Sequence, residues 1–135
     1  MTKTASEIEQ DLYDLVVVST LPSSVNGKLY KKGTRPTDSK VEDIIVGFIA
    51  GLDSEISRGT VFVNIYVPQI LVGGTHIKDI KRTSEVERLL RNFFDTLKGG
   101  EYRFSLDGTI QPYEDTNTKQ DIVSMRMRYK VFTQN

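Results

Sequence analysis

Few residues in this chain combine a reactive side chain with the spacing that catalysis requires. The only histidine is His76, in a Gly-Gly-Thr-His segment, and there is no cysteine. A catalytic nucleophile–base pair of the common kind would have to use His76 as its base. The sequence has no Gly-x-Ser-x-Gly elbow that would supply a nucleophile for it. Metal sites usually need several converging ligands, and Asp79, three residues away in a loop, is one weak candidate. We interpret His76 as a surface histidine.

Two further segments resemble functional motifs only in part. Gly73-Gly74 lacks the Gly-Lys-Ser/Thr ending and the strand-to-helix setting of a phosphate-binding loop, so flexibility explains the two glycines better. Glu42 and Asp43 are adjacent in a predicted strand, so their side chains point to opposite faces and cannot line one pocket. We expect them to form a solvated strand start. These patterns predict a non-enzymatic protein with no cofactor and no metal site.

The most distinctive polar pattern is a row of cations in the last predicted strand. Arg126, Arg128 and Lys130 alternate with apolar residues and therefore share one strand face. This face could receive a polyanion, but a solvated face that discourages edge aggregation is the favoured interpretation, because aromatic side chains for base stacking are sparse there. A third interpretation is a subunit contact with acidic residues in the first helix of a neighbouring copy. Those acidic residues are Glu7, Glu9, Asp11 and Asp14.

Composition narrows the class of protein further. The chain has 135 residues, which suits a single domain over residues 1–135, and its 18 basic and 18 acidic residues give a formal net charge of zero. A dedicated DNA-binding protein usually carries a basic excess, so nucleic acid is not the expected partner. The apolar runs are too short to span a membrane, and the acidic N-terminal segment lacks the apolar core of a signal peptide. We expect a soluble cytoplasmic protein whose neutral charge permits self-association.

Apolar spacing predicts two amphipathic helices. The first begins at Thr4, whose spacing from Glu7 is that of a capping box, in which each residue's side chain accepts a hydrogen bond from the other's backbone N–H. The second covers residues 83–98, with Thr83 or Ser84 as its N-cap. In both segments the apolar residues recur every three or four positions, which places them on one helical face.

Five segments have the composition of β-strands. They are residues 28–30, 42–51, 60–67, 102–106 and 121–133. The segment 42–51 is too apolar for a strand with one wet face, so both of its faces are covered or one meets a partner. A run of strands flanked by two helices predicts an α+β fold. The expected architecture is a mostly antiparallel sheet of about four to five strands with both helices packed on one face, in the order α-β-β-β-α-β-β.

The connection over residues 69–82 is predicted to be a long and unusually apolar loop. Loops of this length inside a compact domain are usually functional or mobile, and the apolar side chains are expected to dock on another protein. We therefore hypothesise that this loop and the basic loop 31–40 form an interface, together with the cationic strand. The expected interface residues are Lys31, Lys32, Arg35, Ile70, Leu71, Val72, Ile77, Arg126, Arg128 and Lys130.

Several strings, and the order of the predicted elements, resemble tail-terminator and head–tail joining proteins of tailed phages and prophages. The strings are IEQDLYDLV, NGKLYKKGTRP, EDIIVGFIAG, TVFVNIYVP, SEVERLLRNFFDTL and DIVSMRMRYKVF. The nearest local likeness is the Gly27-x-Leu29-Tyr30 step, which precedes a loop containing proline. The resemblance covers most of the chain as architecture. It implies a structural subunit, located in the cytoplasm of the bacterial host and then in the virion. Such a subunit forms a ring with its own copies, commonly six, and contacts phage tail-tube or head-connector proteins.

Two other classes of function remain open from the sequence. A small nucleic-acid-binding module would use the basic loop 28–40 and the strand face of Arg126, Arg128 and Lys130, and its binding would depend steeply on salt. A small enzyme or ligand-binding domain would need a cleft between the helices and the sheet. With no cysteine, no tryptophan and a single histidine, it would depend on carboxylates, tyrosines and lysines, and it is the least favoured class.

Overall fold

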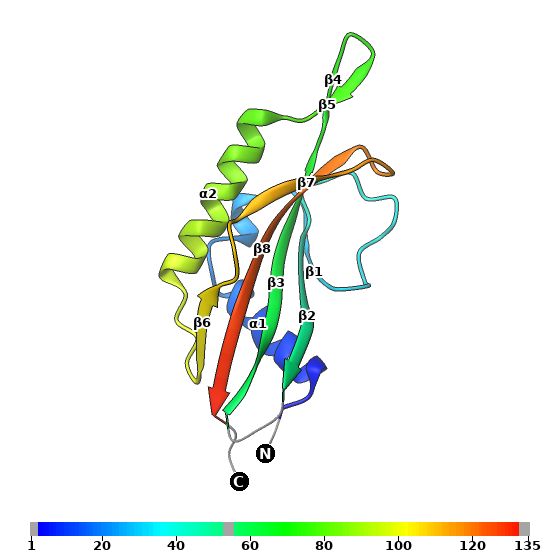
Figure 1. The fold of residues 1–135 in the computed structure, drawn as a ribbon. Helices are drawn as coiled ribbons and strands as arrows, with labels where there is room; N and C mark the ends of the chain where they lie inside the picture. The colour runs from blue at the N-terminus through cyan, green and yellow to red at the C-terminus, as the bar shows by residue number, and fades with distance from the viewer. Residues whose placement is uncertain (1–2, 53–55, 133–135) are drawn as a thin grey trace.

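The computed structural model describes residues 3–52 and 56–132, and this part of the chain forms the predicted α+β fold. Figure 1 shows a twisted sheet with both helices on one side of it. In chain order the elements are α1 (Ala5–Val17), a 3-10 turn (Pro22–Ser24), β1 (Leu29–Lys31), β2 (Ile44–Leu52), β3 (Ile56–Pro68), β4 (Ile70–Val72), β5 (Thr75–Ile77), α2 (Ile80–Thr96), β6 (Tyr102–Leu106), β7 (Gln111–Asp115) and β8 (Gln120–Phe132).

The long antiparallel pair β3–β8 forms the centre of the main sheet. Its strand order is β1-β2-β3-β8-β6, and β7 also pairs with β8. The strands β6 and β7 share one edge of β8, since β6 pairs along its C-terminal half and β7 along its N-terminal half. Pairing is antiparallel throughout this sheet except between β1 and β2, which run parallel. The sheet thus has six strands in the described residues, one or two more than predicted, because residues 111–115, which lie outside the five predicted strand segments, pair as β7.

One hydrophobic core lies between the sheet and the two helices. The strands contribute alternate residues: Val61, Val63, Ile65 and Val67 from β3, and Val123, Met125, Met127, Tyr129 and Val131 from β8. The helices contribute Ile8, Leu12 and Val16 from α1, and Val86, Leu90 and Phe93 from α2. Most of these side chains are fully buried, so the predicted apolar faces of both helices are confirmed.

The start of α1 is confirmed and the start of α2 is one turn earlier than predicted. The Thr4 hydroxyl accepts a hydrogen bond from the Glu7 N–H, and the Glu7 carboxylate accepts one from the Thr4 N–H at 2.8 Å, which completes the capping box. In α2 the N-cap is Asp79, whose carboxylate accepts a hydrogen bond from the Arg82 N–H. Thr83 instead lies inside the helix and is buried. Asp, Ser and Thr are all favourable N-cap residues, so the sequence pattern alone does not show whether Asp79 or Thr83 begins the helix.

The prediction of an irregular loop over residues 69–82 is wrong. Residues 70–72 and 75–77 pair as the antiparallel hairpin β4–β5, and the last three residues of the segment already belong to α2. Gly73 and Gly74 have φ angles of 56° and 82°. Two successive positive φ angles are what a two-residue type I′ turn requires, and glycine adopts them without steric strain. The glycine pair that the sequence suggested was flexible is therefore a tight hairpin turn.

The interpretation of Glu42 and Asp43 as a solvated strand start is also wrong. Both residues precede β2 and both are buried, Asp43 at 1% exposure. Arg82 of α2 donates two hydrogen bonds to the Glu42 carboxylate, at 2.7 and 2.8 Å, and Arg35 donates one to Asp43 at 2.8 Å. A buried carboxylate requires such a partner, because an unpaired charge away from water is strongly destabilising. Each acid therefore pairs with an arginine from a different segment.

Candidate functional site

The face of the sheet opposite the helices carries the candidate site. Side chains of β3, β6 and β8 that alternate with the core residues point to this side, which no helix covers (Figure 1). Five of them are cationic, and we call this set the basic face: Arg58, Arg103, Arg126, Arg128 and Lys130. Arg103, Arg126, Arg128 and Lys130 are exposed, and so is Arg58. The predicted row on β8 is therefore part of a larger cationic surface.

Strand register places three of these cations side by side. Lys130 is directly opposite Arg58 on β3 and directly opposite Arg103 on β6. Neighbouring strands lie about 4.8 Å apart, and like charges at directly opposed positions destabilise a sheet. Among the described residues, neither Arg58 nor Lys130 has an ion pair, and Arg103 donates hydrogen bonds only to the carbonyls of Gly100 and Tyr102. The row thus concentrates positive charge that the rest of this face does not neutralise.

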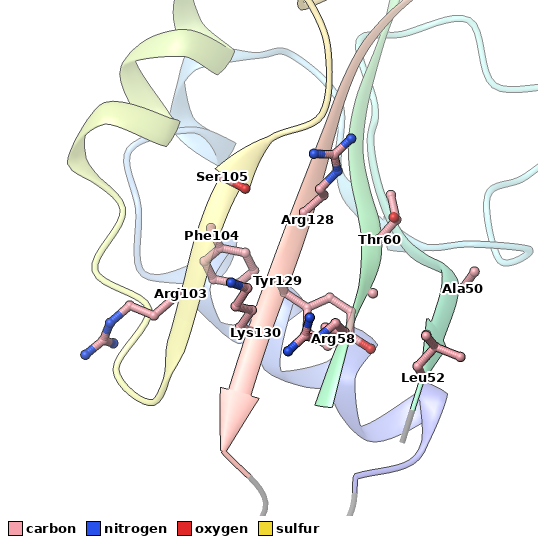
Figure 2. Close-up of a pocket in the computed structure, with 12 residues that line it drawn as sticks. Ala50, Leu52, Arg58, Thr60, Arg103, Phe104, Ser105, Arg128, Tyr129 and Lys130 are labelled. Carbon is pink, nitrogen blue, oxygen red and sulfur yellow. The ribbon is translucent and has the colours of Figure 1, made fainter. Parts of the chain in front are cut away.

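A hollow of about 660 Å³ lies over this row (Figure 2). The cations Arg58, Arg103 and Lys130 line it, together with Leu52 of β2, which is opposite Arg58 and 71% exposed. The hollow is therefore cationic along β3, β8 and β6 and apolar at the β2 end. Such a surface suits a partner that presents carboxylates or phosphates beside apolar groups.

Glycine at position 59 allows the close contacts of the backbone beneath the hollow. Gly59 of β3 pairs with Gly51 of β2 and with Tyr129 of β8. A Cβ atom at position 59 would come within 2.2 Å of the Ala50 carbonyl oxygen and 2.7 Å of the Tyr129 hydroxyl. Glycine is required here because the strand and the tyrosine approach so closely.

The other two cations of the basic face share one acid. Asp107, in the connection after β6, lies 3.0 Å from the Arg128 guanidinium and 3.9 Å from that of Arg126. Both arginines stay more than half exposed, so this pairing is a surface contact that contributes little to stability. A second hollow of about 620 Å³ continues along the same face and is lined by Arg126, Ile49 and Phe62 among others.

The basic loop closes the opposite end of the sheet face. Arg35 donates hydrogen bonds to Asp43 and to the Gln120 side chain, and its guanidinium lies 3.7 Å from the centre of the Tyr66 ring. Ile45 faces the same side of the sheet as Tyr66, yet it is only 7% exposed. The loop therefore covers this end, whereas the end with Arg58 and Lys130 is open.

The electrostatics of Asp43 agree with this closed arrangement. Burial by itself would raise the pKa of the Asp43 carboxyl. Hydrogen bonds from the Ser39 hydroxyl, the Lys28 N–H and the Arg35 guanidinium outweigh burial and hold that pKa below its usual range. The hydrogen bonds that Arg82 donates to the Glu42 carboxylate raise the pKa of Arg82. The Arg35–Asp43 ion pair fixes the loop to the start of β2, and the Arg82–Glu42 pair fixes the adjacent residue to α2.

The structure separates the predicted interface residues of the basic loop. Arg35 is half-buried in the contacts with Asp43 and Tyr66. The Lys31 ammonium donates a hydrogen bond to Gln10 and lies over the Tyr13 ring, both on α1. Lys32 is exposed, and its stem lies beside Gly47 of β2, at the margin of the open sheet face.

The four predicted apolar interface residues gather on the β4–β5 hairpin. Ile70, Leu71, Val72 and Ile77 are between 42% and 63% exposed. Ile70 is directly opposite Ile77 and shares a face with Val72, whereas Leu71 and His76 pair on the other face. Figure 1 shows the hairpin projecting beyond the end of the main sheet, as an extension of β3. The hairpin is an apolar arm that makes no part of the core.

Acidic side chains lie on the helix side of the molecule. Glu7 and Asp14 of α1 are exposed, and Glu9 is half-exposed. Asp11 accepts hydrogen bonds from the Tyr102 hydroxyl at 2.6 Å and from Lys3, which joins α1 to the end of β6. Burial and the neighbouring Asp11 raise the pKa of Tyr102, so it stays a hydrogen-bond donor at neutral pH. The acidic helix therefore backs onto the sheet end that carries the basic row.

The sequence interpretation missed Arg58 and Arg103 as members of the site. Arg58 lies outside the predicted strand 60–67, whereas the structure has β3 begin at Ile56 and include it. The signal was present, because Arg58 continues the alternation of Thr60 and Phe62. Arg103 alternates with Ser105 on a strand that was predicted correctly, but only the pairing of β6 with β8 places it beside Lys130.

Comparison with protein-family models and with curated proteins finds no match for this chain. Within residues 3–52 and 56–132, no helix is both long and apolar enough to cross a membrane. The same residues contain no group of three or more histidine, cysteine or acidic side chains that could hold a metal ion. The features of the described residues that suit contact with a partner are therefore the basic face and the hairpin.

Proposed function

We propose that this protein is a non-enzymatic assembly subunit that forms a ring with its own copies, as a tail-terminator or head–tail joining component of a tailed phage or prophage. The observation that carries the proposal is the β4–β5 hairpin, an apolar arm held outside the core. An isolated two-stranded hairpin is at best marginally stable in water. A partner surface that covers the four half-exposed aliphatic side chains of this arm would therefore stabilise it.

The gain can be estimated from side-chain exposure. Burying a large aliphatic side chain completely is worth about 1.5–3 kcal/mol, and these four are already roughly half-buried. Covering the arm would thus contribute about 3–6 kcal/mol per contact. Repeated around a ring, in which each subunit both gives and receives an arm, such contacts are sufficient to hold an assembly together. The resemblance to phage tail proteins supports a neighbouring copy and a tail-tube or head-connector protein as the partners.

The test is a double substitution that removes the apolar face and preserves the hairpin. Ile70→Lys with Ile77→Glu places opposite charges at directly paired positions, which suits an antiparallel ladder and leaves the net charge unchanged. We expect the wild type to form a closed ring in light scattering on a size-exclusion column and in negative-stain images. The variant should elute as a monomer with a melting temperature within about 2 °C of the wild type, because the arm lies outside the core.

The matched control is Thr75→Ser with His76→Gln, which changes two hairpin residues and keeps the four aliphatic side chains. This control should assemble as the wild type does. A double-charge variant that forms the same ring as the wild type would contradict the assignment of the arm.

A second candidate function, nucleic-acid binding, is favoured by one observation, the row of Arg58, Lys130 and Arg103. The basic loop 28–40 supports this function less, because Arg35 is occupied by Asp43 and Tyr66. Filter binding of duplex and single-stranded DNA and of RNA at low salt tests it. Retention that falls steeply between 50 and 200 mM salt would support nucleic-acid binding, and no retention at micromolar protein would exclude it.

A further inference from the structure

We propose that the basic face receives helix α1 of a second copy, so that copies associate head to tail through opposite sides of the sheet. This inference rests on the proposed assembly function and names the contact that the basic face makes. The surfaces involved are the row Arg58, Lys130 and Arg103 with its hollow, and the outward side of α1.

The first argument is charge complementarity. The chain is neutral overall, yet the open sheet face carries five cations and, among the described residues near them, a single acid, Asp107. The exposed acids Glu7 and Asp14 and the half-exposed Glu9 lie instead on α1, on the helix side of the same sheet. Among the described residues, Arg58, Lys130 and Asp14 make no ion pair. These opposite charges lie on opposite sides of one copy, and they can pair when the helix side of one copy meets the open face of the next.

The second argument is position. Tyr102 pairs with Val131 of β8, one residue after Lys130, and its hydroxyl donates to Asp11 in the middle of α1. The acidic helix is therefore directly behind the end of the sheet whose front carries the basic row. If a second copy stacks in front of the open sheet face, displaced along the perpendicular to the sheet, its α1 lies against that row. An arrangement of this kind repeats, and it closes into a ring when each step includes a suitable rotation.

The third argument is shape and apolar content. An α-helix with its side chains is about 10–12 Å across, and the hollow is an open trough bordered by strands β2 and β6. The outward line of α1 runs through Glu7, Gln10, Asp14 and Val17, which recur every three or four residues. It ends in Val17 and Val18, which are 52% and 83% exposed. The hollow on the basic face has a matching division, with cations on one side and the exposed Leu52 on the other.

A charge-swap experiment on the full chain tests this contact. The face variant is Arg58→Glu with Lys130→Glu, and the helix variant is Asp14→Lys with Val17→Lys, two exposed positions on the outward line of α1, which leaves the Thr4–Glu7 capping box intact. Each variant alone should associate about 100-fold more weakly than the wild type in sedimentation velocity at 50 mM salt, since attraction is replaced by repulsion. Mixed in equal amounts, the two variants should associate again, because the acidic face of one meets the basic helix of the other.

The matched control is Lys81→Glu with Arg88→Glu on α2, which changes the net charge as much as the face variant does but on a surface outside the contact. It should assemble as the wild type does. Circular dichroism melts verify that all variants are folded. At 1 M salt, where the Debye length falls to about 3 Å, the wild type should also associate more weakly.

Three results would overturn the inference, and they point to different causes. If the wild type assembles but the variants do so equally well, or if the mixture does not restore assembly, α1 is not the occupant of the basic face. If the face variant alone loses retention of a DNA probe while the helix variant keeps it, and mixing has no effect, the face binds nucleic acid. If the wild type is monomeric at every concentration and salt, the proposed assembly function fails with it.

Discussion

Replacing Arg35 with alanine should lower the free energy of unfolding by about 3–5 kcal/mol. The Arg35 side chain is 11% exposed and the Asp43 side chain 1% exposed, so their ion pair is buried. The substitution would leave Asp43 with hydrogen bonds from Ser39 and Lys28 but with no cation, and it would also remove the stacking on Tyr66. Losing one partner of a buried pair is severe because the remaining charge stays out of water.

The assay is urea and thermal denaturation at pH 7. For a domain of this size, 1 kcal/mol corresponds to about 3–4 °C, so the melting temperature of Arg35→Ala should fall by about 10–20 °C. Lys32→Ala is the matched control, because Lys32 belongs to the same loop and is exposed. It should change stability by no more than about 0.5 kcal/mol. Arg35→Lys should be intermediate, since it keeps the charge and loses the planar fork of donors.

The pH dependence supplies an independent check. Since the pKa of Asp43 is lower in the folded state, the unfolded state binds more protons in acid, and stability rises with pH there. The contribution of Asp43 is thus complete above the unfolded pKa of about 3.9, and it is lost as pH falls through the folded pKa. Arg35→Ala removes one cause of the low pKa, so its stability should fall less steeply below pH 4. An Arg35→Ala protein as stable as Lys32→Ala, with an unchanged acid slope, would refute the reasoning.

Two further predictions concern the sheet end that carries the candidate site. Gly59→Ala should destabilise the protein by about 1–3 kcal/mol, because the new methyl group overlaps the Ala50 carbonyl oxygen and separates β2 from β3; a thermal melt identical to the wild type would contradict this close contact. Tyr102→Phe should cost about 1–2 kcal/mol in urea denaturation through loss of the hydrogen bond to Asp11, and no change would mean that α1 is held to β6 by packing alone.

The local patterns of the sequence were sufficient for the elements and their buried faces. Alternation placed Arg126 and Arg128 on one strand face, opposite the apolar residues between them, and the Thr4–Glu7 spacing located the start of α1. These predictions succeeded because side-chain direction within one strand or helix follows from a fixed period. The hairpin turn at Gly73-Gly74 could also have been predicted, since a glycine pair between short apolar runs is a known hairpin signal.

Two features of the candidate site depend on contacts between distant segments. Lys130 lies between Arg58 and Arg103 only because β3 and β6 pair with β8 in one particular register, and a shift by one residue would turn those side chains to the other face. Glu42 is buried only because Arg82, forty positions later in the chain, reaches it from α2. A periodic pattern carries no information about which distant strand or helix becomes its neighbour.

The sequence by itself therefore determined the α+β class, the core face of each main element and the cationic face of β8. Tertiary structure alone decided which cations join into one row, that the basic loop is closed by Arg35, and that the acidic helix lies behind the basic face. The physical reason is that periodicity is a property of consecutive residues. Register, ion pairing and the placement of α1 are instead selected by the packing of the whole core between the sheet and its two helices.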